Sequence, residues 1–221
     1  MKRSFSPVRQ YLLASGITIA LLPALAAQTH TAIPAANHSS EQDLPNQIDP
    51  GTFDIVSLKL GMTAKEADDA LTRRFPGIQK GYPMPAEAQF TPGKRYTSAV
   101  SRGTNQFSVL LNFAETYPYD PARPEQLTGI FYTPVTPTDA DRQQFRQSVI
   151  TKYGQPYREV KGISAVWCNK GVSLGSGPLA CAPDTPNLQL KGTELILSNN
   201  GPISRARAAW NRRTTSTAPP L

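Results

Sequence analysis

The chain has 221 residues, with 23 lysines and arginines, 16 aspartates and glutamates, and a formal net charge of +7 at pH 7. This length is enough for one large domain or two small ones. The cations form no dense patch with interleaved aromatic residues, which argues against a nucleic-acid-binding protein.

The first 27 residues have the pattern of a secretory signal peptide. An uncharged, mostly apolar run covers residues 11–25, and small residues then allow cleavage after Ala26 or Ala27. The alternative is a membrane anchor, but a membrane-spanning helix needs about 20 apolar residues. We therefore expect export to the periplasm or the medium, with no transmembrane helix left after cleavage. Three cations precede the apolar run: Lys2, Arg3 and Arg9.

The chain without these three cations is modestly basic. It keeps 20 cations against 16 acidic residues, a net charge near +4. This balance fits an acidic partner or an anionic envelope surface, and it equally fits an ordinary soluble protein. Residues 28–50 are polar, without apolar periodicity, and predict a disordered leader. Both histidines, His30 and His38, lie in this leader.

Residues 51–135 make up the first predicted folding unit. Residues 53–60 suggest a short strand or extended lead-in. Thr63 and Glu66 then form a capping-box pattern that starts a helix, and Pro76 ends it. The proline-containing segment 78–92 predicts an irregular loop. Alternating apolar residues predict three strands, at 94–101, 106–114 and 126–133.

Residues 136–213 make up the second predicted unit, followed by a flexible tail at 214–221. Thr138 and Asp141 give a weaker capping signal, and Gly154 marks the end of the helix. Alternation then predicts strands within 158–168, a tight hairpin over 188–198 and a short basic helix over 203–213. The expected fold class is α+β: two tandem helix-plus-antiparallel-sheet units that share a core or a continuous sheet.

The chain has two cysteines, Cys168 and Cys181. In an oxidising compartment, a closely spaced pair is most simply a structural disulfide. The alternative is a redox pair, but redox pairs usually take a Cys-X-X-Cys form at the start of a helix. The predicted disulfide would join a hairpin whose turn is the glycine-rich segment 169–177, with Cys181 on the returning strand.

Two short motifs resemble those of a known family. Leu60-Gly61-Met62-Thr63 with Glu66 and Ala67, and later Lys152-Tyr153-Gly154-Gln155-Pro156, are similar to the helix-start and helix-end motifs of β-lactamase-inhibitor-protein-like modules. The small lipoproteins of outer-membrane assembly use a similar half-unit, but this chain has no Cys after the signal. The resemblance implies a binding module rather than an enzyme, and it transfers no functional residue.

The folded region contains few groups suited to catalysis. It has no histidine, which excludes Ser-His-Asp and Cys-His arrangements and the usual zinc sites. The acidic pairs at Asp68-Asp69 and at Asp139 with Asp141 fall in the first halves of helices, where carboxylates favour the helix dipole. Glu115 and Asp120 could form a polar site beside the tyrosines. No metal or cofactor is expected.

The remaining candidates for function are tyrosines and arginines in or beside loops. Both residue types are favoured in interface hot spots, although tyrosines also cap small β-cores with the ring buried and the hydroxyl wet. The possible binding surface consists of Tyr82, Tyr96, Tyr117, Tyr119 and Arg123.

These observations predict an exported, non-enzymatic protein-binding module whose partner is another envelope protein. Two alternatives stay open. One is a periplasmic hydrolase that uses Asp/Glu or Ser/Lys. The other is a protein that binds an anionic envelope polymer through the arginines of the last helix: Arg205, Arg207, Arg212 and Arg213.

Overall fold

The computed structural model describes residues 49–136, 138–160, 163–168, 181–182 and 184–216, which all belong to one compact unit. The predicted signal peptide, all but the last two residues of the predicted leader, the glycine-rich turn and the end of the tail lie outside the described residues. Among the residues that the structure describes, no helix combines the length and apolar character needed to cross a membrane.

Helix α1, Ala64–Arg74, begins at the predicted capping box. The Thr63 hydroxyl accepts a hydrogen bond from the Glu66 backbone N–H at 3.2 Å, and the Thr63 N–H donates to the Glu66 carboxylate at 2.8 Å. These two bonds satisfy two backbone donors that the first helical turn leaves without partners. The apolar stripe of the helix, which includes Ala67 and Leu71, is buried against the sheet.

Helices α2 and α3 also match the predictions. Helix α2, Asp139–Tyr153, has a complete capping box formed by Thr138 and Asp141. It ends at Gly154, whose φ of 80° is a conformation that other residues rarely adopt. Helix α3, Gly201–Ser216, is the predicted basic helix, and it extends a few residues beyond the predicted range at both ends.

Two predictions about the first unit are wrong. Residues 53–60 form no strand. A short 3-10 helix, η1 (Pro50–Thr52), precedes them, and the chain then makes a two-residue turn that is closed by backbone hydrogen bonds between Ile55 and Leu58. The expected loop at 78–92 contains two short strands, β1 (Gln79–Lys80) and β2 (Met84–Glu87), which both pair with β3. Prolines disfavour a strand because they lack a backbone N–H, but an edge strand tolerates proline because only one side of its backbone is paired.

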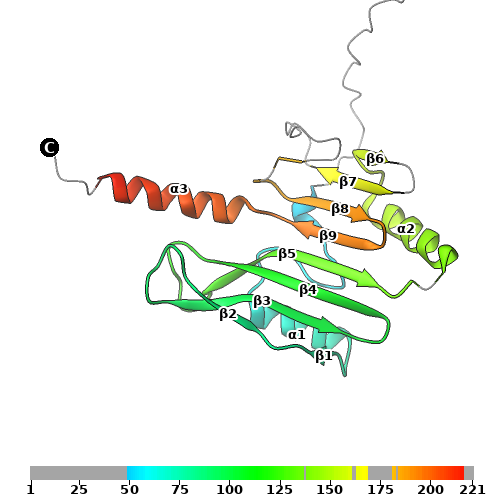
Figure 1. Cartoon of the computed structure of the whole chain (residues 1–221), viewed down its shortest axis with the longest axis horizontal. Coiled ribbons are helices and arrows are strands. Elements are labelled where there is room, and N and C mark those ends of the chain that lie inside the picture. The colour runs from blue at the N-terminus through cyan, green and yellow to red at the C-terminus, as the bar shows by residue number, and fades with distance from the viewer. Residues whose placement is uncertain (1–48, 137, 161–162, 169–180, 183, 217–221) are drawn as a thin grey trace, which may run out of the picture. The chain divides into compact units, whose positions relative to one another are not determined.

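In the part of the chain that the structure describes, nine antiparallel strands form one continuous sheet (Figure 1). The order across the sheet is β1-β3-β4-β5-β9-β8-β7-β6. Strand β2 lies outside this order and, like β1, pairs with β3. Strands β5 and β9 meet at the centre, where Ile130 lies opposite Leu197. The longer strands are β3 (Arg95–Gly103), β4 (Phe107–Glu115) and β5 (Glu125–Pro134); the shorter ones are β6 (Arg158–Val160), β7 (Ser164–Cys168), β8 (Asn187–Lys191) and β9 (Glu194–Ser198).

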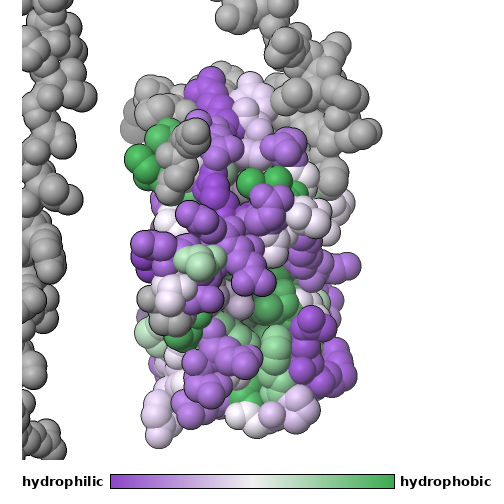
Figure 2. Space-filling model, turned by 90° about the vertical axis from the view of Figure 1, so that its right-hand side faces the viewer, coloured by the Kyte–Doolittle hydropathy of each residue, from purple (hydrophilic) through white to green (hydrophobic). Residues whose placement is uncertain are grey.

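One hydrophobic core joins the strands of both halves of the chain. Leu111 and Ile130 from the first half, and Leu190 and Leu197 from the second, belong to the same buried cluster, which also takes residues from α1 and α2. The surface in Figure 2 is largely hydrophilic, with apolar side chains gathered in smaller areas.

The fold is mixed α and β and mostly antiparallel sheet. Because one sheet and one core run through both halves of the chain, a division into two tandem units is not clear in it.

Candidate functional site

The two cysteines form a disulfide with a Cα–Cα distance of 5.9 Å. Cys168 is the last residue of β7 and is buried. Cys181 lies before β8 rather than on it, so its expected place on a returning strand is wrong. The bond joins the end of β7 to a position six residues before the start of β8, and β7 and β8 are paired strands.

The five predicted binding residues do not form a single cluster. Tyr82 lies between β1 and β2 with 94% of its surface exposed. Tyr96 is half-buried on β3, and burial raises the pKa of its hydroxyl, with a smaller contribution from the charge of Glu115. Tyr119 lies in the β4–β5 loop beside Lys94, whose ammonium is 5.7 Å from the ring centroid.

Arg123 holds the β4–β5 loop against the start of α1. Its guanidinium donates to the two carboxylate oxygens of Glu66, at 3.2 and 3.1 Å, and to the Gly61 carbonyl at 3.0 Å. The Glu66 pKa is lowered, first by its hydrogen bond with the Thr63 N–H and also by Arg123. Arg123 therefore has a local role that explains its position.

Tyr117, one of the five predicted binding residues, lines a cavity. Its ring packs edge-on against Phe90, with centroids 6.1 Å apart, and the Arg213 guanidinium lies 5.4 Å from its centroid. The Tyr117 hydroxyl oxygen is buried and has no hydrogen-bond partner in the structure. A buried polar atom without a partner is uncommon in proteins and often marks the place of a water or a ligand.

The opposite wall of this cavity is α3. Its start is tightly packed, because a Cβ atom at Gly201 would come within 2.5 Å of the Asp184 carbonyl oxygen. The Gly201 N–H donates to the Asn199 side chain, and the Ser204 hydroxyl donates to the Asp184 carboxylate. Farther along the helix, Trp210 packs against Phe90 with ring centroids 6.5 Å apart. Phe90 therefore contacts both walls.

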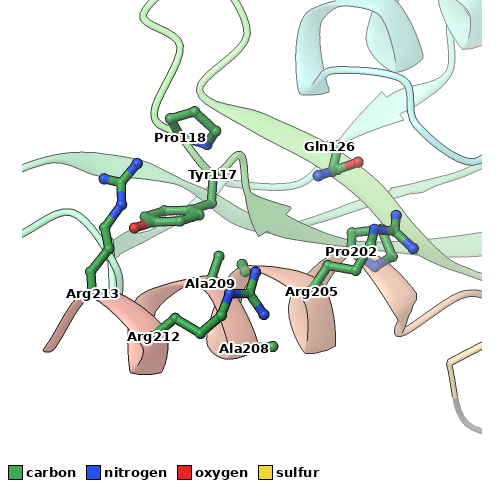
Figure 3. Close-up of a pocket in the computed structure, with 10 residues that line it drawn as sticks. Tyr117, Pro118, Gln126, Pro202, Arg205, Ala208, Ala209, Arg212 and Arg213 are labelled. Atoms are coloured by element: carbon green, nitrogen blue, oxygen red, sulfur yellow. The ribbon is translucent and has the colours of Figure 1, made fainter. Parts of the chain in front are cut away.

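The cavity between these walls has a volume of about 470 Å³ (Figure 3). We call it the arginine groove. Figure 3 shows three arginines of α3 along one side of it, with Tyr117 and Pro118 from the β4–β5 loop and Gln126 from β5 facing them. The lining residues are Tyr117, Pro118, Gln126, Pro202, Arg205, Ala206, Ala208, Ala209, Arg212 and Arg213.

The groove is electropositive. Residues 201–216 contain four arginines and no acidic residue. Three of the arginines, Arg205, Arg212 and Arg213, line the groove, whereas Arg207 lies about 200° around the helix from Arg205 and does not. Within the described residues, no ion pair joins Arg205 to a carboxylate. Clustered charges of one sign in a cleft attract ligands of the opposite sign.

The two candidate carboxylates of the β4–β5 region do not converge. Glu115 is buried at the end of β4, where one oxygen accepts a hydrogen bond from the Phe90 N–H and the other has no partner. Burial raises the pKa of this carboxyl. Asp120 is exposed and accepts a bond from the Ala122 N–H. Neither lines a cavity described for this structure.

In the part of the chain that is described, no three His, Cys, Asp or Glu side chains lie close enough together to hold a metal ion.

The sequence indicates Tyr117 and the arginines of the last helix as separate candidates. It did not bring them together, because the contacts of Phe90 with Tyr117 and Trp210 join residues far apart in the chain. One usable signal was present: Arg205, Arg212 and Arg213 share a helical face with Ala206 and Ala209.

Comparison with protein-family models, with curated proteins and with solved structures finds no match for this chain.

Proposed function

We propose that this protein is an exported, non-enzymatic binding module and that its arginine groove binds another exported protein. One observation carries the proposal: an aromatic side chain with an unpartnered hydroxyl and three arginines converge on one cavity of about 470 Å³. Tyrosine and arginine are the residue types most enriched, with tryptophan, among the residues that dominate binding at protein interfaces. Small side chains, Ala206, Ala208 and Ala209, leave room between them.

Export is part of the proposal. The charged start, the apolar run and the small residues of the first 27 positions support it. The Cys168–Cys181 disulfide also supports it, because disulfides persist in oxidising compartments such as the periplasm or the exterior of the cell.

A tandem organisation is also proposed, as the resemblance to β-lactamase-inhibitor-protein-like modules implies. Each half of the chain has a capped helix followed by antiparallel strands. The final strands of the halves, β5 and β9, lie side by side at the centre of the sheet. This strand order supports two related units that meet through β5 and β9.

Site-specific photo-crosslinking in living cells that express and export the protein tests the proposed function. A photoreactive phenylalanine analogue is placed at Ala208, which lines the groove, or at Arg207, which lies on the same helix outside it. We expect position 208 to capture one defined protein that position 207 does not. The captured protein is then purified, and its affinity is measured for the wild type and for Ala208→Phe, which fills the groove.

The control for this measurement is Arg207→Phe, which adds the same ring on the opposite face of α3. We expect Ala208→Phe to weaken binding of the purified partner at least ten-fold and Arg207→Phe to leave it within two-fold, in line with the cost of disturbing an interface hot spot. Equal capture at both positions, or an Ala208→Phe variant that binds as tightly as the wild type, would exclude the groove as the binding site.

A further inference from the structure

A row of aromatic rings crosses the sheet beside α1 and α2. We infer that this row is a second docking surface, separate from the arginine groove, and that it binds an amphipathic α-helix of a partner protein with a carboxylate beside Arg74. Three features of the row support this occupant: the spacing of its rings, a slot at one end and a cation at the other.

The aromatic row consists of Phe75, which follows α1, Phe107 of β4, Tyr132 of β5 and Phe145 of α2. Successive ring centroids are 4.8, 5.4 and 6.1 Å apart. Phe107 is buried, whereas the other three side chains are only partly buried and pack against the core. Figure 2 looks onto the end of the sheet where β5 ends and α2 begins, and it shows apolar side chains gathered between two hydrophilic areas.

The ring spacing matches the pitch of an α-helix. The apolar stripe of an amphipathic helix recurs every three or four residues, which is about once per 5.4 Å turn. Apolar side chains on successive turns of a partner helix therefore meet successive rings, as in other complexes in which a helix lies in a hydrophobic groove. A β-strand matches less well, because its side chains on one face recur about every 6.8 Å.

One end of the row opens into a slot between α2 and the turn at residues 55–58. The slot has a volume of about 190 Å³, and its walls include Val56, Tyr132 and Phe145. An apolar cavity of about 150 Å³ can hold benzene, so the slot has room for one leucine or phenylalanine side chain. An aromatic or aliphatic anchor in a pocket is typical of a binding hot spot.

The turn beside the slot is strained. Val56 and Ser57 both have a positive φ, 47° and 73°. Two such consecutive positions favour asparagine and glycine, and a β-branched residue there is an outlier. Val56 is only partly buried, so burial of its side chain offsets only part of this strain. Strained residues cluster at ligand clamps, and contact with a partner side chain in the slot gives valine a role at this position.

A cation lies at the other end of the row. Arg74 is exposed, and its guanidinium lies 5.6 Å from the centroid of the Phe75 ring. Within the described ranges, no ion pair joins Arg74 to a carboxylate. A guanidinium that stacks on a ring carries its N–H donors at its edge, where a carboxylate can accept two of them. An acidic residue beside the apolar stripe of the partner helix therefore complements Arg74.

Four fluorescein-labelled peptides test the inference by fluorescence anisotropy with the full mature protein. The first, Glu-Ala-Ala-Leu-Ala-Gln-Ala-Phe-Ala-Gln-Leu-Ala-Ala-Gln-Glu, has its three apolar anchors and both glutamates on one helical face. The second has the same composition with the anchors spread around the helix, the third has proline in place of the alanine after phenylalanine, and the fourth has glutamine in place of both glutamates.

We expect the first peptide to bind at least ten-fold tighter than the second and the third, because only an intact helix with one apolar stripe matches the row. It should bind about two- to five-fold tighter than the glutamine peptide, the size expected for an exposed ion pair.

Variants of the protein make the test specific to the row. Ser148→Trp places a ring in the slot, whereas Gln147→Trp adds the same ring to α2 outside it. We expect Ser148→Trp to weaken binding of the first peptide at least ten-fold and Gln147→Trp to change it less than two-fold. Arg74→Ala should abolish the preference for glutamate over glutamine, and Arg73→Ala, which removes the neighbouring exposed cation, should keep it.

Val56→Asn separates binding from folding. Asparagine suits a positive φ, so this variant should keep or raise the Tm while binding the first peptide at least five-fold more weakly. Ser57→Asn makes a similar change in the same turn but outside the slot, and it should leave binding within two-fold.

Several results would overturn the inference. They are equal binding of the first and scrambled peptides, equal losses from Ser148→Trp and Gln147→Trp, and a glutamate preference that survives Arg74→Ala. A weaker-binding Val56→Asn variant whose Tm also falls would count against it too, and lauric acid that binds in the slot more tightly than any peptide would replace the helix as occupant. None of these variants changes α3, so the crosslinking test of the arginine groove succeeds or fails independently.

Discussion

Glu115 holds Phe90 in place through a hydrogen bond from the Phe90 backbone N–H to one oxygen of its buried carboxylate. The Phe90 ring in turn packs against Tyr117 on one wall of the arginine groove and against Trp210 on the other. The second Glu115 oxygen is buried without a partner. A single carboxyl therefore combines a positioning role with an unfavourable buried charge.

This arrangement predicts an unusual dependence of stability on pH. Burial raises the pKa of Glu115, so the folded protein holds the proton more tightly than the unfolded chain. The stabilisation from the protonated carboxyl is fully present below the ordinary glutamate pKa of about 4.3 and is lost as the pH rises through the raised value. We expect Glu115→Gln, which cannot ionise, to gain stability relative to the wild type as the pH rises.

Urea unfolding at pH 4.5, 6 and 7.5 measures this effect. The control is Glu87→Gln, because Glu87 is exposed on the edge strand β2. A difference between Glu115→Gln and the wild type that stays constant over the three pH values would contradict the prediction.

Asp68 should behave in the opposite way. Its carboxylate on α1 binds Arg102 of β3 and Lys80 of β1, both at 2.9 Å, and only 8% of the Arg102 side chain is exposed. Burial acts to raise the Asp68 pKa, but the hydrogen bonds and charges of Lys80 and Arg102 outweigh it and lower the pKa. The resulting stabilisation is present above the ordinary aspartate pKa of about 3.9 and is lost as the pH falls through the lowered value.

The variant Asp68→Asn should therefore lower the free energy of unfolding at pH 7 by about 1–3 kcal/mol, because a mostly buried guanidinium loses its carboxylate. The neighbouring residue provides a matched control. Asp69 pairs with Lys65, and the two side chains are 46% and 85% exposed, so Asp69→Asn should cost less than about 0.5 kcal/mol. Chemical unfolding at pH 7 compares them, and similar losses for both would refute the assigned role of Asp68.

The disulfide should contribute measurably to stability. Cys168 and Cys181 are 13 positions apart in the sequence. Closing a loop of roughly this size stabilises a protein by about 3 kcal/mol in the chain-entropy model. We expect the double variant Cys168→Ala with Cys181→Ala to lose about 2–4 kcal/mol of unfolding free energy. Unfolding of the wild type with and without reductant makes the same comparison without a substitution. An unchanged free energy of unfolding in both experiments would show that the disulfide does not stabilise the fold.

Local signals predicted most of the helices and strands. Both capping boxes, at Thr63 and at Thr138, form as expected, because each depends on contacts between residues three apart. Apolar alternation located β4 and β9 for a similar reason: the pattern along a strand records which face is buried. The errors occur where pairing overrides propensity, as in β2, which carries Pro85 and still adds to the edge of β3.

The arginine groove depends on contacts that no local pattern contains. The spacing of Arg205, Arg212 and Arg213 is enough to place them on one face of a helix, because helical geometry repeats every 3.6 residues. That this face lies against Tyr117 follows from the folding of distant segments onto one another. That placement depends on Phe90, which contacts Tyr117 and Trp210 across 27 and 120 positions of the chain. Packing between such distant segments follows from burial of their shared apolar surface, which becomes visible only once the chain has folded.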